Sequence, residues 1–215
     1  MPIKVTVAGR TDSGVHASGQ VVSFVAHDRF PIDRLSIALN TILPPDVSAR
    51  DAARVEDRFS ARLSALERRY RYVVLNRRDP SALVRRFVHH EHRALDLTRM
   101  RAGARHLVGE HDFVTFCGVL PDRGGTVRTV DALDIEADGE RITLAIRGKS
   151  FLHRMVRIVA GTLLDVGAGG SEPADVAEML AARDRRVAGP TAPAAGLTLV
   201  EVLYPGFSSL SRRNG

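Results

Sequence analysis

The chain has 215 residues, a formal net charge of +6 and a single cysteine. This length supports one large or two small domains with a real core, and the lone cysteine excludes an internal disulfide and a cysteine-rich metal site. No apolar run is long enough to span a bilayer and no signal-peptide core precedes the first strand, so we expect a cytoplasmic protein. Only two of the 31 basic residues are lysines, Lys4 and Lys149. Arginine binds phosphate as a fork and stacks on bases, so this bias is compatible with a nucleic-acid partner.

Apolar periodicity predicts a mixture of strands and helices. In chain order we expect strands over 4–7 and 20–26, a helix over 32–42, a strand over 68–76, a helix over 96–107, strands over 127–136 and 141–147, helices over 151–166 and 173–182, and a strand over 198–203. Hairpins without strict strand–helix alternation favour an α+β fold with a mixed or antiparallel central sheet flanked by helices. The loop around Phe59 is a candidate junction between parts 1–62 and 63–215, and the tail from Gly206 is expected to fray.

One short stretch, "AGRTDSGVHASGQVVSF" at 8–24, places a carboxylate in a glycine-bearing turn between two strands. Taken alone, Asp12 is most simply an Asx-turn residue, and a functional carboxylate at a cleft is the other interpretation. The triplet that ends at Gly14 also fits an aspartic protease, but that chemistry needs a second such carboxylate and the chain has no second D-S-G or D-T-G. Ser13 and His16 do not specify a hydrolytic triad.

Three further features have plain structural interpretations. The histidines of "HHEH" at 89–92 alternate across an expected strand, so they favour exposed polar residues over a metal site. The "GAGG" at 167–170 is a helix stop, because no Lys-Ser/Thr follows it as in a phosphate loop. Cys117 is expected to be a buried small hydrophobe.

Six segments, taken in order, resemble the characteristic motifs of the TruA family of tRNA pseudouridine synthases. The first is A-G-R-T-D-x-G-V-H-x-x-G-Q-V, which 8–21 matches. The others are "NTILPPDV", "RFSARLSALERRYRYVV", "LVGEHDFVTF", "FLHRMVRIVAGTLLDVG" and "TAPAAGLTLVEV". Together they extend from about Val5 to Tyr204.

The resemblance implies a pseudouridine synthase fold, with two α/β halves and the active-site cleft between them. It implies isomerisation of uridine to pseudouridine at positions 38, 39 and 40 of the tRNA anticodon stem-loop, without a cofactor or metal, by a homodimer that binds tRNA and no membrane. Asp12 matches the indispensable catalytic aspartate, as a nucleophile. Arg10 and Arg157 match the cations near it, and His153 is expected one turn before Arg157 on the same helix face.

The resemblance also places substrate contacts on this chain. Tyr70 matches the tyrosine that stacks on the target base, whereas Tyr72, on the same face of the strand, is expected to belong to the core. Leu197 matches an apolar residue beside the base pocket. Arg62, Arg10 and the loop 120–124 occupy positions where the family contacts tRNA.

The family normally has a strand, a Y-D-G…G-W-Q-like stretch and a helix before its first motif, whereas this sequence has no tryptophan and begins almost at the motif. We therefore expect an incomplete N-terminal half, from a start assigned too late or from a fragment. A truncated RNA-binding paralogue without isomerase activity is the alternative function.

Overall fold

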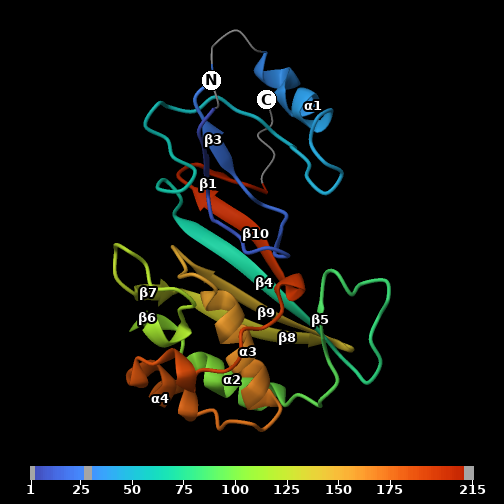
Figure 1. Ribbon diagram of the computed structural model, residues 1–215, viewed down its shortest axis with the longest axis vertical. Coiled ribbons are helices and arrows are strands. Elements are labelled where there is room, and N and C mark those ends of the chain that lie inside the picture. Colours follow the sequence, from blue (N-terminus) through green and yellow to red (C-terminus); the bar gives the residue numbers. More distant parts are fainter. Residues whose placement is uncertain (1–2, 27–30, 211–215) are drawn as a thin grey trace.

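The computed structural model describes residues 3–26 and 31–210, and Figure 1 shows an elongated molecule with the N-terminal elements at one end and most helices at the other. The strands are β1 (Val5–Val7), β2 (His16–Ala17), β3 (Val22–Phe24), β4 (Glu67–Asn76), β5 (His89–Glu91), β6 (Gly109–Asp112), β7 (Val127–Val130), β8 (Ala132–Asp138), β9 (Arg141–Gly148), β10 (Leu197–Tyr204) and β11 (Phe207–Ser208). The helices are α1 (Ile32–Asn40), α2 (Leu97–Arg105), α3 (Met155–Gly167) and α4 (Asp175–Ala182), with short 3₁₀ helices η1 (Val114–Phe116), η2 (Arg185–Val187) and η3 (Ala194–Gly196).

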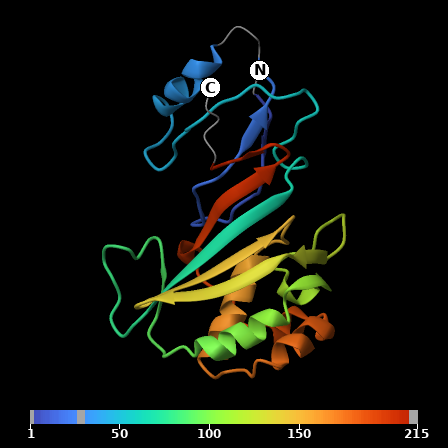
Figure 2. The same cartoon turned by 180° about the vertical axis from the view of Figure 1, so that it is seen from behind.

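A mixed sheet forms the centre of the molecule, which confirms the predicted α+β class. Its strand order is β11-β10-β4-β9-β8, with β2 parallel to β10 and β5 parallel to β4. The central strand β4 alternates, so Tyr70 and Tyr72 face the buried side while Arg71 is exposed on the other. Seen from both sides, α2 and α3 lie on one face of this sheet, α2 against β8 and α3 against β4, and α4 packs against α2 (Figures 1 and 2).

Helix α3 is apolar nearly all round, and it is enclosed by the sheet, by α2 and by η1. Eleven of its 13 residues are buried, as expected for a helix enclosed on every side. The helix begins at Met155 rather than at the predicted Phe151. The reason is Arg154, which has a left-handed backbone (φ 58°) that a continuous right-handed helix cannot include.

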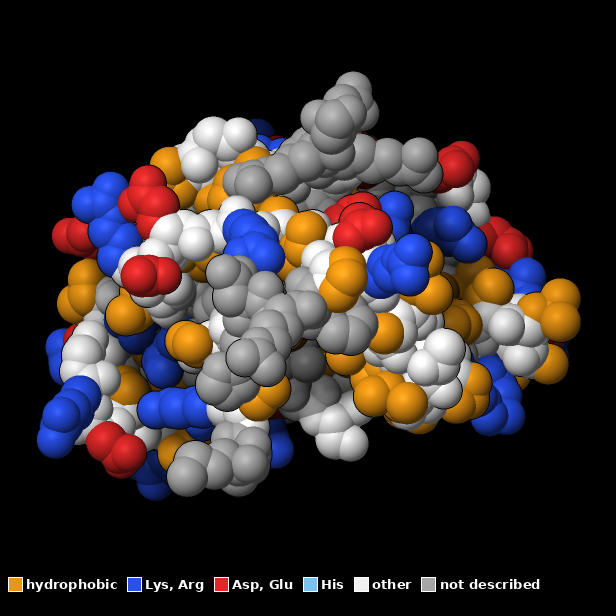
Figure 3. Space-filling model, turned by 90° about the horizontal axis from the view of Figure 1, so that it is seen from above, with side chains coloured by type: hydrophobic (Ala, Val, Ile, Leu, Met, Phe, Trp, Pro, Cys, Tyr) orange, Lys and Arg blue, Asp and Glu red, His pale blue; other side chains and the backbone are white. Residues whose placement is uncertain are grey.

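The N-terminal elements pack less tightly than the central sheet. β1 and β3 form a separate antiparallel pair, and α1 has no buried residue along its length. Ile37 and Ile42 are 66% and 78% exposed. The view from this end shows apolar side chains among charged ones (Figure 3). Among the described strands before β4, β2 pairs with the central sheet, through β10.

Most predicted elements are confirmed, with two informative differences. The predicted strand 127–136 is interrupted at Asp131, where β7 turns away to pair with β6 while β8 stays with β9. The tail predicted to fray forms β11 at Phe207–Ser208, because Phe207 stacks on Tyr204 at 4.8 Å. Residues 211–215 lie outside the described part of the chain. The division at residue 62 stays a prediction.

Replacing Gly161 by Ala is expected to destabilise the fold, because an added Cβ would lie 1.8 Å from the carbonyl oxygen of Pro190. Backbone has to move to accept it, at a cost of about 1–3 kcal/mol. Gly103→Ala is the matched control, since that helical glycine meets only side-chain ends of Val176 and Leu163, at 3.2 and 3.3 Å. Urea denaturation measures both, and equal midpoints for the two variants would contradict the expectation.

Candidate active site

The turn that carries Asp12 is closed by its main chain, not by its side chain. The N–H of Val15 donates to the carbonyl of Asp12 at 3.0 Å, and Gly14 takes φ +81°, as the third residue of a type II turn requires. The Asp12 carboxylate is directed at α3 instead, so the Asx-turn interpretation is wrong.

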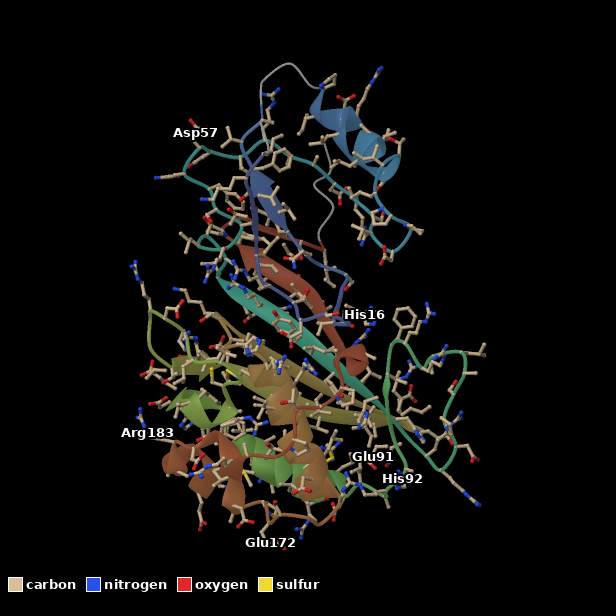
Figure 4. The ribbon with its side chains drawn as sticks, in the orientation of Figure 1. His16, Asp57, Glu91, His92, Glu172 and Arg183 are labelled. Atoms are coloured by element: carbon tan, nitrogen blue, oxygen red, sulfur yellow. The ribbon has the colours of Figure 1, made fainter. Side chains whose placement is uncertain are left out.

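The chain after the turn is fixed to the edge of the central sheet. β2 pairs with β10, and the N–H groups of Ser18 and Gly19 both donate to the carbonyl of Leu199, at 2.9 and 3.2 Å. His16, labelled in Figure 4, lies against Phe87 of the loop before β5, with its Nε2 2.6 Å from the carbonyl oxygen of Arg86. Asp12 therefore sits on a loop with a rigid downstream end.

The Asp12 carboxylate meets three cationic or potentially cationic groups at the start of α3. Its Oδ2 accepts from Nη1 of Arg157 at 2.6 Å and lies 3.8 Å from Nε of Arg154. Its Oδ1 lies 3.7 Å from Nε2 of His153, beyond hydrogen-bond distance. The Asp12 side chain is 22% exposed. One carboxylate oxygen thus stays available to a substrate.

Arg157 is itself positioned by main-chain contacts. Its Nε donates to the carbonyl of Ala192 at 2.8 Å, and the N–H of Ala192 donates back to the carbonyl of Arg157 at 3.0 Å. Because the guanidinium is held by a second segment, it presents a fixed face to Asp12. The sequence predicted His153 on the helix, which is wrong: His153 lies in the turn before α3. The N–H of Gly118 donates to the carbonyl of His153 at 2.8 Å.

A buried arginine, Arg68, holds the other end of the loop that carries Asp12. Its side chain donates to the carbonyl of Ala8 from Nε and Nη2, at 3.0 and 2.7 Å, to the carbonyl of Arg62 at 2.7 Å, and to that of Lys149. It is 7% exposed, and burial lowers its pKa. Sequence analysis did not single out Arg68, although strand alternation puts it on the same buried face as Tyr70 and Tyr72.

The two tyrosines and Leu197 lie together on the helix-covered face of the sheet. Tyr72 is fully buried and donates to the carbonyl of Pro193 at 3.0 Å, which confirms its predicted core position. Leu197 is its register partner on β10. Tyr70 is 8% exposed, packs edge-on against Phe151, and lies beneath Gly9, where an added Cβ would be 3.2 Å from its hydroxyl. Burial raises the pKa of Tyr70, and the Asp12 charge adds to this shift.

The two remaining predicted residues are exposed and lie at the surface around this site. Arg10 precedes Asp12 by two positions and is not among the groups within 4.0 Å of its carboxylate in the described chain. Arg62 contributes its carbonyl to Arg68, while its own side chain is exposed. Both guanidinium groups are accessible to a polyanion.

The remaining sequence features have structural roles. Across residues 3–26 and 31–210, no group of three or more His, Cys, Asp or Glu is placed to hold a metal ion. In "HHEH", His90 contacts the carbonyl of Arg77 and Glu91 pairs with Arg93. Cys117 is buried, as predicted, and burial raises the pKa of its thiol.

Comparison with known proteins agrees with this geometry. A family model described as tRNA pseudouridine synthase matches residues 104–205. A tRNA pseudouridine synthase A of Bacillus licheniformis is 44% identical over 202 residues, which cover 94% of this chain and 82% of the relative. The enzyme of the same name from Bacillus subtilis is 43% identical with the same coverage, and that from Methylobacterium nodulans is 47% identical over 95% of this chain and 81% of the relative.

A mixed sheet covered by helices on one face, with a loop-borne aspartate paired to an arginine of α3, is consistent with the pseudouridine synthase class. Within that class, the relatives identify the group. The chain belongs to the TruA family of tRNA pseudouridine synthases.

Replacing Arg68 by Lys is expected to lower the free energy of unfolding by about 2 kcal/mol or more, because a lysine cannot reach three carbonyl groups and leaves buried acceptors unpaired. Arg69→Lys is the matched control on the next position of β4. Arg69 is 43% exposed and pairs with Glu67 and Glu201, so its replacement should cost under about 1 kcal/mol. Guanidinium chloride denaturation of both variants decides the matter, and similar losses would refute the role given to Arg68.

Proposed function

We propose that this chain converts uridine to pseudouridine at positions 38, 39 and 40 of the tRNA anticodon stem-loop, with Asp12 as the nucleophile. The observation that carries the proposal is the 2.6 Å pair between Asp12 and Arg157, formed by the two motifs that match the catalytic segments of the family. The relatives named above support the activity and the choice of tRNA. They also disfavour the alternative, an RNA-binding paralogue without isomerase activity.

The reaction needs only groups that the site provides. Uridine and pseudouridine are isomers: the C1′–N1 bond breaks, a C1′–C5 bond forms, and the hydrogen lost from C5 is balanced by the one gained at N1. No oxidant, reductant or co-reactant enters. A carboxylate nucleophile divides such a change into easier steps. Oδ1 of Asp12 is the oxygen placed to react, while Arg157 holds Oδ2.

Substrate binding is proposed to combine stacking with phosphate attraction. The target base has to leave its stack, which costs a few kcal/mol, and an aromatic partner returns about 1–3 kcal/mol. Tyr70 supplies that partner and Leu197 the adjacent apolar wall. Because Tyr70 is nearly covered, base entry requires the contact between its hydroxyl and Gly9 to open. Arg10 and Arg62 bind phosphates, and binding of tRNA across two subunits of a homodimer in the cytoplasm completes the proposal.

No helix within the described ranges is long and apolar enough to cross a membrane.

Asp12→Asn is expected to reduce pseudouridine formation by about 10⁴-fold or more, because the nucleophile is lost while the shape is kept. The assay incubates unmodified tRNA with the protein and maps pseudouridine at each position of the anticodon arm, alongside a tRNA-binding measurement. Asp134→Asn, an exposed aspartate on β8, is the control. Product from Asp12→Asn equal to wild type would exclude the nucleophile role. Binding without product from the folded wild-type protein would favour the RNA-binding alternative.

Tyr70→Phe and Tyr70→Leu separate stacking from the hydroxyl. The phenylalanine variant keeps the ring and should bind tRNA like wild type, whereas the leucine variant should lose about 1–3 kcal/mol of substrate binding. Single-turnover rates over a range of tRNA concentrations give the apparent affinity of each. Wild-type affinity in Tyr70→Leu would show that this ring does not carry the base.

A further inference from the structure

A hollow of about 440 Å³ lies beside Gly118, and its volume is within the range of about 300–1,000 Å³ typical of ligand sites. It is formed where the segment after η1 meets the segment between α4 and η2. The lining residues are Val114, Cys117, Gly118, Leu120, Arg183, Asp184, Arg185 and Arg186. Arg183 is labelled in Figure 4, at the end of α4.

Gly118, in the lining of the hollow, lies against two residues that are also near the carboxylate of Asp12. A Cβ placed on Gly118 would lie 2.8 Å from Nδ1 of His153 and 3.1 Å from Cδ of Arg154. Those same two residues lie 3.7 and 3.8 Å from the carboxylate of Asp12. The hollow therefore adjoins the two residues that lie near the Asp12 carboxylate just before α3.

The rim of the hollow is rich in guanidinium groups with donors to spare. Arg183 is 64% exposed and uses Nη1 on Asp112 at 2.5 Å, and Arg186 is 88% exposed and pairs with Asp184. Each guanidinium carries five N–H donors, so these pairs leave several directed at solvent. Arg185 is turned inward, onto the carbonyl of Ala188 and the hydroxyl of Thr191.

Two unusual backbone conformations occur at or near the hollow. Among residues 3–26 and 31–210, Arg154 and Arg183 are the two non-glycine residues with positive φ, at 58° and 55°. This conformation crowds Cβ and persists only where the surroundings impose it, commonly at ligand-binding positions. Both residues are arginines: Arg183 lines the hollow, and Arg154 lies against Gly118 of its lining.

The apolar part of the lining complements this charge. Leu120 is 61% exposed, and Val114 and the buried Cys117 lie behind it. An apolar surface beside guanidinium groups matches a nucleotide, with its flat base and anionic phosphate. Among the residues that line the hollow, the family resemblance predicts tRNA contact for Leu120 alone. The arginines at 183–186 belong to no motif identified in the sequence.

We propose that this hollow is a second RNA subsite, which holds a nucleotide adjacent to the target uridine with its phosphate on Arg154 and Arg183 and its base on Leu120. The proposal rests on the proposed function. It assigns a role to the segment between α4 and η2, and it makes recognition of the neighbouring nucleotide part of substrate binding.

Arg183→Asn tests the phosphate contact, since asparagine tolerates a left-handed backbone. We expect KM for unmodified tRNA to rise roughly tenfold, kcat to stay within about twofold, and the slope of log KM against log salt to fall by roughly 0.7–0.9. Asp112→Asn weakens the same ion pair but keeps the guanidinium, so it should not raise KM. Arg141→Asn, an exposed arginine on β9, controls for net charge. A rise in KM for Asp112→Asn equal to that for Arg183→Asn would overturn the proposal.

Leu120→Cys carrying a thiol-linked photocrosslinker tests the position independently of folding energetics. We expect crosslinks to the nucleotides next to the modified uridine. Wild type treated with the same reagent is the control, because its Cys117 is buried. Crosslinks confined to the acceptor or elbow region, with pseudouridine still formed, would refute the subsite while leaving the proposed function intact. Loss of product in the wild-type protein would instead count against the proposed function.

Discussion

The loop that carries Asp12 is held by one buried cation, Arg68, which has no carboxylate partner in the described chain. Arg68 binds the carbonyls of Ala8, Arg62 and Lys149, so three segments far apart in sequence meet at one guanidinium. Neutral acceptors satisfy its donors but leave its desolvation cost uncompensated, which is why its pKa falls. The chain that leads to Asp12 is thus fixed by hydrogen bonds from Arg68 to neutral carbonyl groups.

The opposite wall of the site is built by close backbone packing. Gly161 lets the 190–192 segment approach α3, and the reciprocal hydrogen bonds between Arg157 and Ala192 then fix the guanidinium that meets Asp12. The two walls are held differently: by the guanidinium of Arg68 on the sheet side, and by the close approach at Gly161 on the helix side. The Asp12 carboxylate lies where they meet, and its orientation therefore depends on the packing of both.

Local sequence patterns account for much of this arrangement, and tertiary contacts account for the rest. The alternation along β4 placed Tyr70 and Tyr72 on one face, and the apolar run ending in "GAGG" located α3 and its end. β2 has two residues and β6 has four, which is too short for a periodic signal, and both exist because of partners distant in sequence. The left-handed Arg154 likewise follows from contacts with Gly118 that no local pattern encodes. The motifs supplied Asp12 and Arg157 but not their geometry.

The anchoring of the loop that carries Asp12 determines which parts of the N-terminal region open locally at low free energy. The loop is tied to the central sheet on both sides, by Arg68 at Ala8 and by Leu199 at Ser18 and Gly19. α1, in contrast, contributes no buried residue. Regions with few buried contacts open at low free energy, so α1 is free to exchange its amide hydrogens rapidly while the amides of Ser18 and Gly19 remain protected. The turn that carries Asp12 thereby belongs to the cooperative unit of the central sheet, although it lies among the N-terminal residues in sequence.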